Sequence, residues 1–257
     1  MKELLTVIAA ISIILGILGV LIVLADIRNG HRQRMPVMET VWPLTALWGS
    51  WAGVLIYFRF GRQHRPSPTD ELMNMDMRPQ RAVPPPSEEM PGMSDMKRTP
   101  GSTDNINTAR PEWISVLHST LHCGAGCVLA DLLCELLFLF APITIAGSTI
   151  AGLWTLEYIL ALILGIGFQY AAMQQMHRSP VGPTVKRALK ADFLSLTAWQ
   201  AGMYGWMALT LFVFFPDGLG RDTWTFWFMM QLAMFTGLAV SYPVNRWLLR
   251  IGLKHAM

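Results

Sequence analysis

Six apolar stretches are the feature that most constrains the fold of this chain. They comprise residues 4–25, 41–58, 121–141, 150–173, 193–215 and 224–240. A helix that crosses a bilayer needs about 20 mostly apolar residues, and the six stretches reach or approach that length. Charged residues make up only 14% of the chain, against roughly 25% in a typical soluble domain. The sequence therefore predicts an all-α integral membrane protein with about six transmembrane helices.

The basic residues predict how these helices are oriented. If the N-terminus is cytoplasmic, 16 of the 20 Lys and Arg residues fall on the cytoplasmic side and four on the other side. Cytoplasmic loops carry an excess of Lys and Arg, so we expect both termini to be cytoplasmic. The segment with Arg28, Arg32 and Arg34 fits this orientation poorly, which makes the first two spans the most open to revision.

Residues 61–112 differ from the rest of the chain. They hold nine of the sixteen prolines and no aromatic residue, so they have too little apolar surface to offset the entropy cost of ordering. We interpret them as a disordered linker between an N-terminal two-helix hairpin (residues 1–60) and a C-terminal four-helix domain (residues 113–257). The linker contains a methionine cluster: Met73, Met75, Met77, Met90, Met93 and Met96. Thioethers favour Cu(I), but compositional drift in a low-complexity segment is the simpler explanation.

Ionisable and metal-binding side chains gather in one predicted membrane helix, in the segment LHCGAGCVLADLLCE at residues 121–135. At about 100° per residue, one helix face carries three thiols and two carboxylates. These residues are Cys123, Cys127, Cys134, Asp131 and Glu135.

Two histidines lie on another face of the same helix. His118 and His122 are one turn apart but about 100° to 140° away from Cys123. A straight helix therefore cannot bring His122 and Cys127 to one metal ion. Either the glycines at residues 124 and 126 distort the helix, or the histidines contact a neighbouring helix.

The helix face that carries the two carboxylates cannot face lipid. Asp131 and Glu135 together raise the free energy of membrane insertion by about 5 to 7 kcal/mol at mid-bilayer, and nine apolar neighbours lower it by roughly 3 to 5 kcal/mol. We expect this face to lie against other helices or a wet cavity, where ionisable residues are functional candidates. Polar or sulfur-containing partners are available on the other predicted helices: Glu157, Gln169, Met173, Met176, His177, Gln200, Met203, Met207, Gln231 and Met234.

Four separated motifs resemble a known family. They are HCGAGCVLAD, KADFLSLTAWQAGMYGWM, SYPVNRWLLRIGLKHAM and, near the start, VMETVWPLTALWGSWAGVLIYFRFGR. They are similar to the bacterial integral-membrane family called domain of unknown function 4396, whose first motif usually reads H-C-G-A-G-C-x-L-G-D. His122, Cys123, Cys127 and Asp131 match that motif, whereas Ala130 stands where the family favours glycine. The resemblance implies a small six-span protein of the bacterial inner membrane and gives no activity.

Our leading hypothesis is a membrane protein that binds a soft transition metal, with Cu(I) favoured, for transport or delivery. Its ligands would be Cys123 and Cys127, completed by His122 or by a methionine, Met203 or Met207. The supporting residues would be His118, Asp131 and Glu135, which orient ligands or relay protons.

Two alternatives stay open, and the sequence does not decide whether the protein is an enzyme, although the leading hypothesis is not enzymatic. The first is a membrane redox or haem-binding protein, with haem held between His118 or His122 and His177. The second is a non-catalytic scaffold in which HCGAGC only packs helices, because small residues let membrane helices approach closely. The net charge of +3 and the positions of the basic residues indicate membrane topology rather than a nucleic-acid partner.

Overall fold

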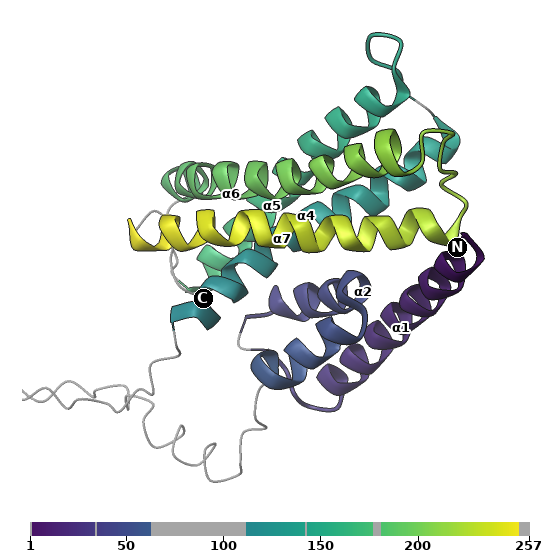
Figure 1. Cartoon of the computed structure of the whole chain (residues 1–257). Coiled ribbons are helices and arrows are strands. Elements are labelled where there is room, and N and C mark those ends of the chain that lie inside the picture. The colour runs from purple at the N-terminus through teal and green to yellow at the C-terminus, as the bar shows by residue number, and fades with distance from the viewer. Residues whose placement is uncertain (1, 34, 63–111, 142, 177–180, 252–257) are drawn as a thin grey trace, which may run out of the picture. The chain divides into compact units, whose positions relative to one another are not determined.

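The computed structural model describes residues 2–33, 35–62, 112–141, 143–176 and 181–251, without the side chains of residues 139, 169 and 172–192. The described part folds into six long α-helices and contains no β-strand, which confirms the predicted all-α class. The helices are α1 (Lys2–Arg28), α2 (Met38–Ile56), α4 (Glu112–Phe140), α5 (Thr149–Met176), α6 (Val181–Leu209) and α7 (Trp224–Arg250) (Figure 1). One π-helical turn follows α2 and another, η2 (Thr210–Phe214), follows α6.

Five of the six helices in the described part are long and apolar enough to cross a membrane: α1, α2 with its π-turn, α4, α5 and α7. The exception is α6, whose middle carries Trp199, Gln200 and Tyr204 in place of aliphatic residues. This helix begins at Val181 rather than at residue 193, where the predicted span starts. The extra turns contain good helix formers such as Lys, Arg and Ala, so helix continues where apolar character stops. The membrane concerned and the side on which each terminus lies stay predictions.

The helices pack into one compact unit. The most extensive contacts join α6 with α7, α1 with α2, and α4 with α5, while α7 also contacts α1 and α4. One hydrophobic core includes Trp42 and Trp48 of α2 together with Trp199 of α6. The helices of residues 1–60 and 113–257 therefore share a core. Most of the predicted linker, with its methionine cluster, lies outside the described residues, and the domain division stays a prediction.

Polar contacts join the N-terminal hairpin to α7. The Gln231 side chain accepts a hydrogen bond from Ser12 Oγ of α1 at 2.7 Å and donates one to the Leu47 carbonyl of α2 at 3.0 Å. In α2, Ser50 leaves helical geometry (φ 50°, ψ −135°), and its hydroxyl donates to the Ser12 carbonyl at 3.0 Å. Such bonds between membrane helices are worth about 0.6 to 2 kcal/mol each, so they help to fix this face of α7 near the site described next.

Candidate functional site

The glycines of HCGAGC bring α4 close to two neighbouring helices. A Cβ atom on Gly124 would overlap the indole ring of Trp199 in α6, and one on Gly126 would lie 3.1 Å from the Gly165 amide nitrogen in α5. The helix is continuous from Glu112 to Phe140, so the glycines do not break it. Both positions thus have a packing role of the small-residue kind.

The two histidines of α4 contact aromatic rings on different helices. His118 meets the edge of Trp42 of α2 with ring centroids 5.5 Å apart, and His122 meets Phe168 of α5 at 6.1 Å. Of the two explanations given by the sequence, contact with neighbouring helices is therefore correct. His177, the second haem ligand of the haem hypothesis, lies outside the described residues.

The three thiols are buried and reduced, and they have different surroundings. The hydroxyl of Ser195 in α6 lies 3.1 Å from Cys123 Sγ and 2.9 Å from Asn245 Oδ1 of α7. Cys134 instead packs in a small cluster with Phe138 and Leu153. Within the described ranges, no group of three or more His, Cys, Asp and Glu side chains is arranged to hold a metal ion. The Cu(I) site at Cys123 and Cys127 stays a prediction.

Three carboxylates of α4 and α5 lie near one another in the bundle. Asp131, Glu135 and Glu157 are 3%, 5% and 1% exposed, and they are close enough to interact electrostatically. Both carboxylate oxygens of Asp131 and one oxygen, Oε1, of each glutamate have no hydrogen-bond partner in the described part of the chain. Burying an ionised carboxylate without compensation costs several kcal/mol. These oxygens are therefore positioned for a ligand, a proton or water.

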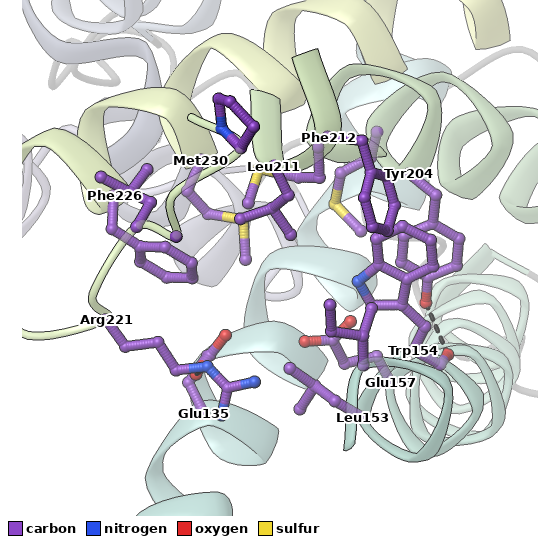
Figure 2. A pocket seen from close by; sticks show the side chains of 16 residues that line it. Glu135, Leu153, Trp154, Glu157, Tyr204, Leu211, Phe212, Arg221, Phe226 and Met230 are labelled. Atoms are coloured by element: carbon purple, nitrogen blue, oxygen red, sulfur yellow. Dashed lines mark hydrogen bonds and ion pairs between the residues drawn. The ribbon is translucent and has the colours of Figure 1, made fainter. Parts of the chain in front are cut away.

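Two of the carboxylates line a cavity of about 290 Å³, which we call the first cavity. Figure 2 shows Glu135 and Glu157 with their carboxylates facing this space. Its walls come from α4, α5, α6, η2, the segment between η2 and α7, and α7 itself. The other lining residues are Ile150, Leu153, Trp154, Met203, Tyr204, Met207, Leu211, Phe212, Pro216, Gly218, Leu219, Arg221, Phe226 and Met230. Met203 and Met207, predicted as ligands, therefore meet the acidic residues here, whereas His122, Cys123 and Cys127 are not among the lining residues.

Charge and aromatic rings set the character of the first cavity. Arg221 Nε lies 3.6 Å from Glu135 Oε2, so one guanidinium partly offsets two carboxylates. The rings of Trp154 and Tyr204 stack at 4.8 Å, and the Tyr204 hydroxyl donates to the Trp154 carbonyl at 2.7 Å (Figure 2). The cavity is thus acidic, with aromatic rings and thioethers around the acids.

Met230 also lines a second, smaller cavity of about 110 Å³. Asp131 lines this second cavity together with Trp48 of α2 and Gln231 of α7. Asp131 and Glu135 are one turn apart on α4, so the two cavities lie next to each other along this helix.

Sequence reasoning counted Arg221 only as one of the four basic residues on the non-cytoplasmic side and missed its ion pair with Glu135. The sequence offers one signal: Arg221 is the single basic residue between the fifth and sixth apolar stretches, so a specific acidic partner could be expected for it. It also missed the aromatic wall. Trp154 and Tyr204 come from different helices, and only the packing of α5 against α6 brings them together.

A comparison with protein families finds a match over more than half of the chain. Residues 112–254, which include α4 and the residues that line the first cavity, match the family model described as a domain of unknown function, DUF4396. Neither the search of curated proteins nor that of solved structures finds a match. The N-terminal motif VMETVWPLTALWGSWAGVLIYFRFGR lies before the matched range. The chain therefore belongs to the family of domain of unknown function 4396.

Proposed function

We propose that this membrane protein binds a small organic cation in the first cavity, as the recognition step of its transport or sensing. The observation that carries the proposal is the pair Glu135 and Glu157. Each is at least 95% buried and lines the first cavity, and one carboxylate oxygen of each has no hydrogen-bond partner in the described residues. A positive charge between them would compensate the desolvation of both carboxylates.

The walls and size of the first cavity support an organic cation over a bare ion. Aromatic faces attract cations, with a gain of about 0.5 to 2 kcal/mol per contact, and Trp154, Tyr204, Phe212 and Phe226 line the space. Its volume of about 290 Å³ is close to the lower end of the roughly 300 to 1,000 Å³ of small-molecule pockets. A bare metal ion needs a much tighter group of ligands.

Cu(I) is the second candidate, and a specific observation favours it. Three thioethers, from Met203, Met207 and Met230, line the first cavity, and thioethers are soft ligands that select Cu(I). In this case the ion would bind at the methionines rather than at Cys123 and Cys127. The carboxylates would then balance its charge.

The test is equilibrium binding to the purified wild-type protein in detergent. Isothermal titration calorimetry with ammonium, guanidinium, choline and tetraethylammonium tests the first candidate, and competition with a colorimetric Cu(I) chelator tests the second. We expect an organic cation to bind to the wild type and to lose at least about tenfold in affinity in Glu157→Gln, which corresponds to roughly 1.4 kcal/mol. The exposed Asp222 lies outside the cavity lining, so Asp222→Asn is the matched control and should bind normally.

The two candidates give different results. Cu(I) binding that is lost in a Met203→Leu/Met207→Leu variant, without any organic cation binding, would replace the first candidate by the second. If the folded wild type binds none of these cations, both are wrong.

A further inference from the structure

Four buried side chains of α4 follow one another at intervals of four residues: Cys123, Cys127, Asp131 and Glu135. Residues at this spacing form a continuous ridge on a helix. At about 1.5 Å per residue the ridge is roughly 18 Å long, which is more than half of the roughly 30 Å hydrocarbon core. All four side chains are at most 5% exposed. The ridge begins at the first cavity, which Glu135 lines, and runs towards the N-terminal half of α4.

Two polar side chains of α6 lie near residues of this ridge. The Ser195 hydroxyl contacts Cys123 Sγ at 3.1 Å, and Tyr204 interacts electrostatically with Glu157, Asp131, Cys127 and Cys134. Gln200, also on α6, is 1% exposed, and its amide nitrogen and oxygen have no partner in the part of the chain described.

Gln200 continues the wall of the first cavity into the bundle. It precedes the lining residues Met203 and Tyr204 by three and four residues, so helical spacing places it on the same face of α6, one turn further from the cavity. Leaving a buried amide without hydrogen bonds costs about 1 to 3 kcal/mol. A passing cation or its water would offset that cost at the amide oxygen.

We propose that the ridge of α4 and the facing side chains of α6 form a path along which a cation moves from the first cavity towards Cys127 and Cys123. The inference rests on the proposed function, because it extends the route of the same cation. The groups along the path are carboxylates, an amide, hydroxyls and thiols, all of which offer oxygen or sulfur to a cation. Arg221, the basic partner of Glu135, lies at the cavity end of the path.

Thiol modification of the native protein tests the path without knowledge of the transported cation. The wild type in detergent is treated with cationic 2-aminoethyl methanethiosulfonate or with anionic 2-sulfonatoethyl methanethiosulfonate, and fragmentation mass spectrometry locates the modified cysteines. We expect the cationic reagent to modify Cys127 about tenfold or more faster than the anionic one, because an acidic cleft concentrates cations. Glu135→Gln should reduce this ratio.

Cys134 is an internal reference on the same helix. It packs against Leu153, which lines the first cavity, and interacts electrostatically with Glu157, so it reports whether each reagent reaches the cavity. The path is refuted if the cationic reagent modifies Cys134 but not Cys127, or if the two reagents modify Cys127 at equal rates.

The calorimetry described above separates the two proposals. Cation binding without modification of Cys127 would leave the first cavity as a closed binding site and overturn only the path. If the protein neither binds a cation in calorimetry nor is modified at Cys127, the proposed function is overturned as well.

Discussion

Replacement of Gly124 by alanine should destabilise the protein, because the added methyl group has no space. The Cβ atom would overlap the Trp199 ring, which is fully buried. That ring cannot shift freely, since its opposite side lies against Gly237, where a Cβ would be only 2.9 Å from Trp199 Nε1. The edge of Trp48 packs on the same ring with centroids 6.0 Å apart. The overlap must therefore be relieved by movement of α4 against α6.

The loss of stability in Gly124→Ala can be estimated by comparison with a second glycine. Gly205 of α6 has open space where the methyl group of an alanine would lie, with no heavy atom within 4 Å. Gly205→Ala and Gly124→Ala share the gain in helix propensity, which is about 1 kcal/mol. The difference between the two variants therefore isolates the overpacking cost, about 1 to 3 kcal/mol. At about 2 to 4 °C per kcal/mol for a chain of this size, Gly124→Ala should melt roughly 2 to 12 °C below Gly205→Ala.

The buried cysteines provide the assay. A thiol-reactive coumarin dye becomes fluorescent when heating exposes Cys123, Cys127 and Cys134, so it reports unfolding in detergent without a label. Equal melting temperatures for Gly124→Ala and Gly205→Ala would refute the packing role assigned to HCGAGC. A Gly124→Ala variant more stable than the wild type would refute it as well.

Three further predictions concern the polar contacts. Ser195→Ala removes the hydroxyl that contacts both Cys123 and Asn245 and should lower the melting temperature by roughly 2 to 4 °C, the equivalent of about 1 kcal/mol for one hydrogen bond. An unchanged melting temperature would show that these contacts add no stability. Gln231→Leu breaks the link from α7 to both helices of the hairpin and should cost about 1 to 3 kcal/mol, measured by the same dye assay, whereas a neutral effect would contradict the anchoring role. Arg221→Gln removes the positive charge beside Glu135 and should tighten cation binding by up to about fivefold, or about 1 kcal/mol. Weaker binding in calorimetry would instead place Arg221 in contact with an anion.

The helices could be predicted from sequence because hydropathy is a local property. Each of the six apolar stretches lies within a helix of the structure, to within one residue once the π-turns are included, although α4, α6 and α7 extend well beyond their stretches. The acidic face of α4 is buried, as its insertion cost required. The start of α6 could not be found in this way, since its first turns are helical without being apolar. Hydropathy indicates whether a segment lies in lipid or in water. It does not indicate whether the backbone of a polar segment is helical.

The site could be predicted only in part. Helical spacing placed Asp131 and Glu135 on one face and separated the histidines from Cys123, and both results agree with the structure. The meeting of Glu135 with Glu157 and Arg221 depends on how α5 and the segment before α7 pack against α4. A single sequence carries no signal for such a contact. The Cu(I) site at Cys123 and Cys127 stays a prediction.

An experimental structure of the protein with a bound organic cation tests the central claim most directly. The cation should be the one that binds most tightly in calorimetry, added at a saturating concentration. Our account predicts density for it between the carboxylates of Glu135 and Glu157, with its body against Trp154 and Tyr204. Density only outside the first cavity, or ordered water alone between the two carboxylates at saturation, would contradict it.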